Sequence, residues 1–125
     1  MSALSRSQKI KGESFLNEAE KTLKKSTWFA SSTEQKYEDA AELYEKAANA
    51  FKVGHFYSEA GDAYMKAGEL HRDKSKNLGE ASKALGNAGS CYKKSNPVEA
   101  VKAYRSAVTL LCDNGRLTQV SMMHV

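Results

Sequence analysis

The sequence lacks the features that mark several large classes of protein. It has one proline, Pro97, and two cysteines among 125 residues. A disordered chain would carry more proline and fewer apolar residues, and two cysteines are too few for a disulfide framework. Because Cys91 and Cys112 both fall in helical patterns, we expect buried, reduced thiols. No apolar run approaches the length of a membrane span, and no signal peptide is visible, so we expect a cytosolic protein.

A strong charge of either sign is also missing. The net charge of +4 is a mild basic bias, which favours acidic partners or an anionic membrane surface without selecting either. The basic residues are spread along the chain and the tyrosines occupy core positions, so nucleic acid is not an expected partner. Hydrophobic residues at 41% and charged residues at 27% are ordinary for a globular protein, and the length predicts one domain over 1–125.

What the sequence does contain is a repeat of about twenty residues. Four segments each begin with an acidic residue and continue with alanine, a large residue, alanine and a large residue at steps of four, three and four. Such steps lie on one face of an α-helix, where small and large residues let neighbouring helices interdigitate. The four sets are Ala40, Tyr44, Ala47 and Phe51; Ala60, Tyr64, Ala67 and His71; Ala81, Leu85, Ala88 and Tyr92; and Ala100, Tyr104, Ala107 and Leu111.

Boundary residues punctuate this pattern. Asn77 and Asn96 are predicted N-caps, each with a glutamate three residues later, and Pro97 then stands at a first helical position. Gly54 and Gly115 fit C-terminal caps. The helices are predicted at about 5–25, 34–53, 56–73, 78–94, 97–113 and 117 onward.

Four glycines fall inside the predicted helices, where each costs about 1 kcal/mol relative to alanine. We expect them to permit close contact between neighbouring helices; the alternative is that they are tolerated surface positions. They are Gly61, Gly68, Gly86 and Gly89.

The repeat predicts an all-α fold, a tetratricopeptide-like right-handed α-solenoid of antiparallel helical hairpins. One hairpin spans about forty residues, somewhat longer than the 34-residue tetratricopeptide repeat, whose tryptophan-led signature is missing. The segment 117–125 begins a helix and leaves its apolar side uncovered, whereas solenoids need a polar terminal cap. We therefore expect the N-terminal fragment of a longer solenoid or a truncated product.

Residues that would carry catalysis are scarce. His55, His71 and His124 have no metal-ligand spacing, and His71 occupies a repeat position that predicts helix packing. The glycine-containing segment 86–89 lies within a helix and follows no strand, so it is no phosphate loop. Cys91 has no histidine partner at a readable spacing. We expect no catalytic, cofactor or metal site, and a protein that acts by binding other proteins.

The most distinctive local segment is the predicted loop 26–32. It holds Trp28, the only tryptophan, beside Phe29, and it follows Lys24 and Lys25. Aromatic side chains favour the membrane–water interface, and nearby lysines are attracted to anionic head groups. The alternative is that Trp28 folds back onto the first two helices.

Several stretches in order resemble the N-terminal part of the soluble NSF attachment proteins, closest to the alpha/yeast-type branch. No single motif is diagnostic, but their order and spacing together cover nearly all of the chain beyond the first few residues. The stretches are 17–21, 42–52, 59–64, 70–71, 86–94, 96–100 and 113–118.

The resemblance implies an adaptor in vesicle-mediated transport and membrane fusion. Such proteins bind the four-helix bundle of syntaxin-type and other SNAREs and recruit the hexameric AAA ATPase NSF, which pulls the bundle apart. Complementary charge between basic residues and the acidic bundle would support binding. Arg116 matches a family position used for SNARE contact, and Lys93 and Lys94 fall in a similar basic turn. A second basic family position corresponds to Met122 here.

The resemblance also implies membrane contact through Trp28 and Phe29, in a loop with fewer aromatics and glycines than the usual family version. The C-terminal helices that engage the ATPase in the family are absent from this chain. Two other functions fit the residues. One is a generic tetratricopeptide-like scaffold that captures a helix or peptide, and the other is a peripheral membrane module whose loop is its main function.

Overall fold

Five helices make up the described part of the chain. The computed structural model describes the backbone of residues 1–26 and 30–123, and the side chains of 1–26 and 33–113. Within these residues there is no strand, which confirms the predicted all-α class. The helices are α1 (Ala3–Lys24), α2 (Ala30–Val53), α3 (Tyr57–Asp73), α4 (Leu78–Tyr92) and α5 (Pro97–Met123).

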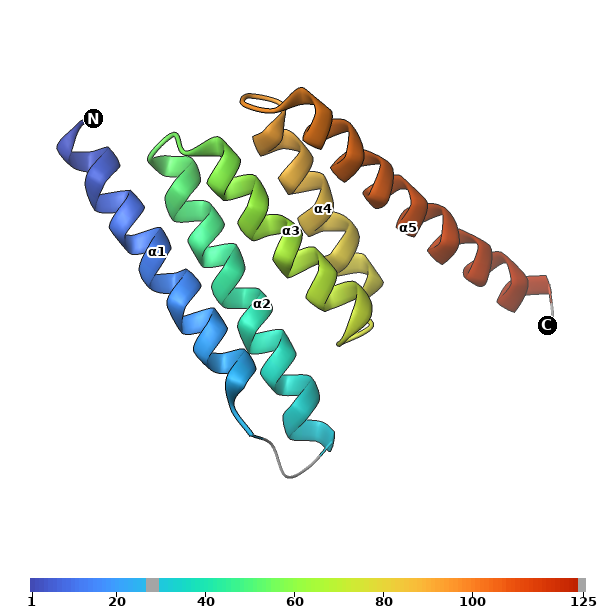
Figure 1. Ribbon diagram of the computed structural model, residues 1–125. Coiled ribbons are helices and arrows are strands. Elements are labelled where there is room, and N and C mark those ends of the chain that lie inside the picture. Colours follow the sequence, from blue (N-terminus) through green and yellow to red (C-terminus); the bar gives the residue numbers. More distant parts are fainter. Residues whose placement is uncertain (27–29, 124–125) are drawn as a thin grey trace.

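The helices follow one another in an antiparallel row, and each packs on the next (Figure 1). Helices α1 and α3 line one groove together and α3 and α5 line another, while α2 and α4 line a third. The odd-numbered helices therefore share one face and the even-numbered helices share the other. This arrangement is consistent with an α-helical solenoid.

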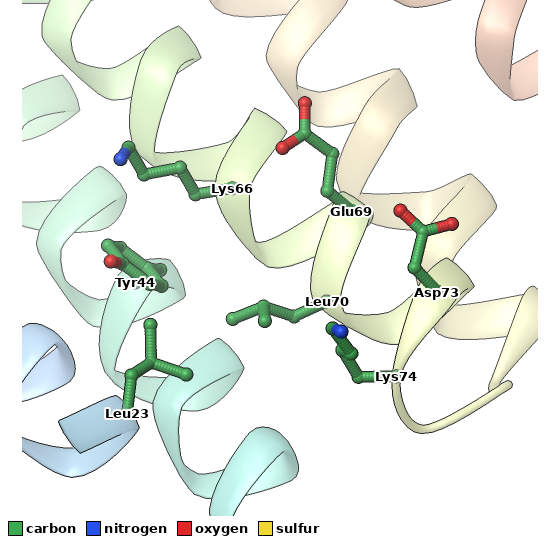
Figure 2. A pocket seen from close by; sticks show the side chains of 7 residues that line it. All are labelled: Leu23, Tyr44, Lys66, Glu69, Leu70, Asp73 and Lys74. Atoms are coloured by element: carbon green, nitrogen blue, oxygen red, sulfur yellow. The ribbon is translucent and has the colours of Figure 1, made fainter.

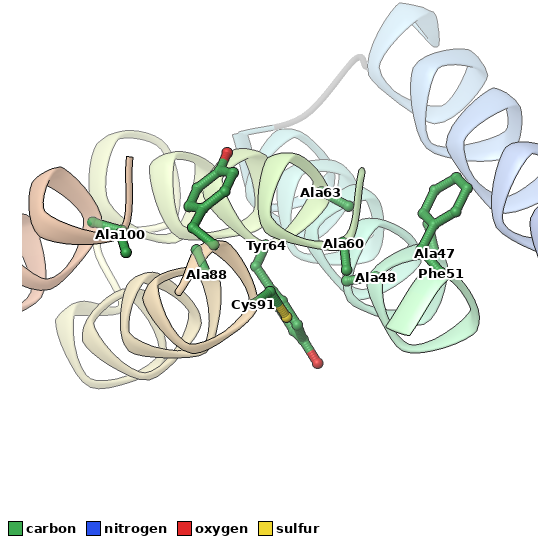
Figure 3. Packing of buried hydrophobic residues seen from close by; sticks show 11 residues of the cluster. Ala47, Ala48, Phe51, Ala60, Ala63, Tyr64, Ala88, Cys91 and Ala100 are labelled. Atoms are coloured by element: carbon green, nitrogen blue, oxygen red, sulfur yellow. The ribbon is translucent and has the colours of Figure 1, made fainter. Parts of the chain in front are cut away.

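The alanines of the repeat form the inside of the stack, as the pattern predicts. All eight are buried, with no more than 7% of any of them exposed. The main cluster joins α2, α3, α4 and α5, and Figure 3 shows small alanines alternating there with the larger Phe51 and Tyr64. Partly buried Phe15 and Leu16 bring α1 onto the same cluster. Small residues thus let the backbones approach, and a few rings fill the remaining space.

Large repeat residues rest on glycines of the preceding helix. A Cβ atom added at any of four glycines would come within 2.6 to 2.8 Å of such a side chain, closer than carbon atoms can pack. The predicted close contact is confirmed at Gly61, Gly68 and Gly89, whereas Gly86 faces open space and fits the surface alternative. The pairs, glycine first, are Gly12 with Phe51, Gly61 with Tyr92, Gly68 with Leu85, and Gly89 with Tyr104.

The predicted N-caps are confirmed, whereas the left-handed residue that follows α2 is His55 and not the predicted Gly54. The side chains of Asn77 and Asn96 accept hydrogen bonds from the backbone N–H three residues later. Helix α2 ends just before Gly54, but His55 takes the left-handed conformation, with φ of 68°. The His55 N–H donates to the Lys52 carbonyl and the Phe56 N–H to the Phe51 carbonyl. This Schellman pattern places Phe56 against Phe51, so an apolar contact compensates for the unusual φ of a non-glycine residue.

The predicted helix break at Gly115 is wrong, and so is the separate sixth helix from 117 onward. Helix α5 runs without interruption from Pro97 to Met123. A glycine weakens a helix by about 1 kcal/mol but keeps its N–H donor, so it does not force an end in the way that proline does. Helix α2 also begins earlier than predicted, at Ala30 and not near residue 34.

The two cysteines differ, contrary to the prediction that both are buried. Cys91 lies in the main core cluster, whereas Cys112 is exposed on α5, and both thiols are free. Burial raises the pKa of the Cys91 thiol, and Lys52 and Lys94 oppose that rise only in part. Cys91 is therefore a small apolar core residue, and Cys112 is the accessible thiol.

Candidate interaction surfaces

Tyrosine hydroxyl groups at repeat positions connect α3, α4 and α5 each to the helix before it. Tyr64 on α3 donates to Asn49 Oδ1 on α2 at 2.6 Å, and Tyr92 on α4 donates to the Asp62 carboxylate on α3. The Tyr104 hydroxyl of α5 lies 3.1 Å from Ser90 Oγ on α4. Burial, with Asp62 adding to it, raises the pKa of Tyr92, so this hydroxyl remains a donor over the physiological range. These contacts fix the register of a rigid scaffold.

A groove opens between α1 and α3, above α2 (Figure 2). Leu23, Tyr44 and Leu70 point into it and give it an apolar floor, and charged side chains of both signs stand around its edge. Lys66 Nζ lies 5.7 Å from the centre of the Tyr44 ring. The volume of the groove is about 260 Å³. It suits one or two apolar side chains of a protein partner better than a buried small molecule.

The predicted contact residues Lys93 and Lys94 are exposed in the turn between α4 and α5. Lys94 Nζ lies 4.7 Å from the centre of the Tyr57 ring at the start of α3. The Ser58 hydroxyl donates to Ser95 Oγ at 2.9 Å beside it, which ties the turn to α3. A cation held over an aromatic ring remains available to an acidic partner while its position is restricted.

Arg116 and Met122 lie on the last part of α5, and their side chains are outside the described residues. Their helix begins beside the Lys93–Lys94 turn and runs away from it (Figure 1). With a rise of about 1.5 Å per residue, roughly 30 Å separates Arg116 from that turn. The structure therefore does not bring the three predicted SNARE-contact residues together, and a partner that meets all of them must present acidic groups over roughly 30 Å.

Trp28 and Phe29 also lie outside the described residues, but their flanks are described. The α1–α2 connection and the α3–α4 turn are at the same end of the helices (Figure 1). Lys36 Nζ donates to the Lys25 carbonyl at 3.2 Å and lies 5.0 Å from the centre of the Tyr37 ring. Lys74 Nζ lies 5.6 Å from the same ring. Three lysines thus lie at this end of the molecule: Lys25 just after α1, Lys36 on α2 and Lys74 just after α3.

His71 is buried in the helix packing, as predicted, but its ring also makes a polar contact that the repeat pattern does not reveal. Its Nε2 atom lies 3.3 Å from Glu45 Oε1 on α2. Burial raises the pKa of Glu45; His71 opposes the rise and Glu80 adds to it. The prediction of no metal site rested on the spacing of residues along the chain. Such spacing does not identify side chains that meet from different helices.

Among the described residues, no helix combines the length and the apolar character needed to cross a bilayer. The search among curated proteins found no match. One family model matches residues 10–125, and its description is soluble NSF attachment protein, SNAP.

Proposed function

Because the chain belongs to the soluble NSF attachment protein family, a family of non-enzymatic adaptors, we propose that it serves as such an adaptor in vesicle-mediated transport. In this role it binds the SNARE four-helix bundle and takes part in recruiting an NSF-type AAA ATPase that separates the bundle after membrane fusion. The observation that carries the proposal is the family match over residues 10–125.

The spacing of the basic residues supports a rod-shaped partner. Lys93 and Lys94 stand at one end of α5, and Arg116 stands roughly 30 Å away along it. A helical bundle with acidic residues along its length offers charge at both places. The net charge of +4 has the sign that attraction to such a bundle requires.

The lysines beside the α1–α2 connection support a peripheral place at a membrane surface on the cytoplasmic side. Lys25, Lys36 and Lys74 lie at the end of the stack where α1 ends and α2 begins. Each lysine near an anionic surface contributes about 1 kcal/mol to binding, and the two aromatic residues would supply the apolar part.

The finer assignments belong to the same proposal. They are the alpha/yeast-type branch, correspondence to the N-terminal portion of the family in one domain over 1–125, and a right-handed tetratricopeptide-like arrangement. Engagement of the ATPase is assigned to the C-terminal helices of the family, and residues 1–125 are proposed to supply the SNARE contact.

The SNARE role is tested by retention of the protein on an immobilised, assembled SNARE bundle at low and moderate salt. We expect retention that weakens with salt and drops at least tenfold in an Arg116→Glu variant, with a smaller loss for Lys93→Glu/Lys94→Glu. Lys21→Glu, an exposed change of the same charge on α1, is the matched control and should bind as the parent does. Absence of retention at every salt concentration would exclude the adaptor role.

The membrane contact is tested separately by flotation with liposomes that contain or lack anionic lipid. We expect flotation with anionic liposomes, less of it for Lys74→Glu, and little for Trp28→Ser/Phe29→Ser. Equal flotation of the parent and the double variant removes the membrane contact. Flotation without SNARE retention would favour a peripheral membrane module.

A further inference from the structure

Three side chains from three consecutive helices meet beside the groove between α2 and α4. They are Glu45 of α2, His71 of α3 and Glu80 of α4, and one potential ligand atom from each lies within 4.8 Å of the others. Glu45 Oε1 and His71 Nε2 are 3.3 Å apart. The residues are far apart in the sequence, so this meeting is a property of the fold.

His71 is an unusual choice for its position. The matching repeat positions hold Phe51, Tyr92 and Leu111, which fill space with carbon atoms. His71 is 7% exposed, and its Nδ1 atom has no hydrogen-bond partner among the described residues. A buried imidazole costs free energy that a phenyl ring would not. What the histidine adds is a ring nitrogen, Nε2, which lies 3.3 Å from Glu45 Oε1 in a cluster that also contains Glu80.

Two carboxylates belong to this cluster, one of them half-buried and the other exposed. Burial is the main cause of the raised pKa of Glu45; His71 opposes that rise, and Glu80 adds to it less strongly. Two carboxylates that converge at a partly buried position make a favourable place for a cation.

The cluster is accessible from outside. Glu45 and Glu80 line a pocket of about 220 Å³ on the face formed by α2 and α4, together with Asn49, Tyr64, Lys83, Ala84 and Asn87. Glu80 is exposed at the edge and Glu45 lies deeper. An ion can therefore enter from solvent and retain bound water on its open side.

We propose that Glu45, His71 and Glu80 form a binding site for a divalent transition-metal ion, with Zn²⁺ as the best fit. One imidazole nitrogen and two carboxylate oxygens, completed by water, are ligands that Zn²⁺ accepts, whereas Mg²⁺ and Ca²⁺ prefer oxygen alone. Zinc bonds of about 2.0–2.2 Å in a tetrahedron place neighbouring ligand atoms roughly 3.3–3.6 Å apart. The Glu45–His71 pair already has that separation, and Glu80, whose ligand atom lies within 4.8 Å, has to move closer to complete the set.

The ion would join α2, α3 and α4 across the middle of the stack. Binding requires a neutral imidazole with its proton on Nδ1, where the described residues provide no acceptor. Histidine ligands usually donate that proton to a second group, and loss of such a partner costs ten- to a hundredfold in affinity. We therefore expect a dissociation constant in the micromolar range, suited to reversible binding and not to a permanent structural metal.

The test is titration of the full chain, freed of metal with a chelator and carrying Cys112→Ser to remove the exposed thiol, with ZnCl₂ in a calorimeter. We expect one equivalent to bind. We also expect the Tm to rise by roughly 10 °C at a hundredfold excess over the dissociation constant. Co²⁺ in place of Zn²⁺ should give the visible absorption of a site with few ligands.

Two variants locate the site. Glu80→Gln changes an exposed residue and should weaken Zn²⁺ binding at least tenfold without altering the circular dichroism spectrum. His71→Phe, which places at this position the residue found in the first repeat, should abolish it. Glu42→Gln, one turn earlier on α2 and exposed, is the matched control and should bind as the parent does. Absence of saturable binding, or binding that persists in Glu80→Gln and His71→Phe, overturns the proposal.

Discussion

Helices α4 and α5 carry the same alanine pattern, but their large residues lie in different surroundings. Leu85 and Tyr92 on α4 are 0% and 5% exposed, whereas Tyr104 and Leu111 on α5 are 39% and 58% exposed. The alanines are buried in both helices. Helix α4 packs between α3 and α5, while α5 packs on α4. The repeat thus determines which face of a helix packs, and the number of neighbouring helices determines how deeply its large residues are buried.

Truncating one large residue on α4 and one on α5 should give the largest difference in the free energy of unfolding. Leu85→Ala should lower the free energy of unfolding by about 2–5 kcal/mol, because it empties a fully buried space beside Gly68. Leu111→Ala should cost less than about 1 kcal/mol, since its side chain is mostly in water. Urea unfolding measures both. Equal losses would mean that α5 is covered in solution.

Adding one methyl group at each of three glycines should change the free energy of unfolding by graded amounts. Gly61→Ala would press against the buried Tyr92 ring and should destabilise by about 1–3 kcal/mol. Gly89→Ala should cost less, because the half-exposed Tyr104 can turn outward. Gly86→Ala meets nothing within 4 Å and should stabilise by up to about 1 kcal/mol. A loss at Gly86 equal to that at Gly61 would refute the packing explanation.

The hydroxyl groups should differ in their response to high pH. The pKa of Tyr92 is raised in the folded state above its ordinary value of about 10, so folding binds the phenolic proton more tightly. Its contribution is fully present below the unfolded pKa of about 10 and is lost progressively as the pH rises from there through the higher folded pKa. Tyr92→Phe should cost about 1 kcal/mol at neutral pH and reduce the alkaline loss of stability.

The alkaline loss should not disappear in that variant, because burial also raises the pKa values of Tyr44 and Tyr64. Tyr104→Phe, which loses a contact with exposed Ser90, is the comparison for the loss of a hydroxyl group at neutral pH. Unfolding free energies between pH 8 and pH 11 decide the matter. If the slope of the unfolding free energy against pH is the same in Tyr92→Phe as in the parent, Tyr92 does not contribute to the alkaline loss of stability.

The two thiols should differ in their reactivity, and this comparison involves the smallest change in stability. Cys112 should react rapidly with a disulfide reagent in the native protein, whereas Cys91 should react only when the stack opens. One fast equivalent is expected, and Cys112→Ser should remove it. Two fast equivalents would show that the α4–α5 contact opens readily.

The sequence was sufficient for features that depend on local order. The alanine face, the Asn77 and Asn96 caps and the first helical position of Pro97 follow from neighbours a few residues away, and all are confirmed. Features that depend on distant neighbours were missed or misjudged. The exposure of Cys112 reflects which helices surround α5, and the continuity of α5 past Gly115 reflects a weak local preference.

The contact surfaces were harder still to predict. Gly12 receives Phe51 although it lies outside the repeat, so no internal periodicity singles it out. Glu45 and Glu80 meet His71 only because three helices bring them together. For the proposed SNARE contacts, sequence similarity supplied the residues, and the backbone added the length over which a partner must extend.

The contacts between helices have a direction. In four cases the receiving glycine lies on the earlier helix and the large residue on the later one, and Tyr64, Tyr92 and Tyr104 likewise bond backward along the chain. During synthesis, each new helix therefore leaves the ribosome to find its docking surface already made. The stack can grow in the order of translation, and no helix has to wait for a later one before it finds its place.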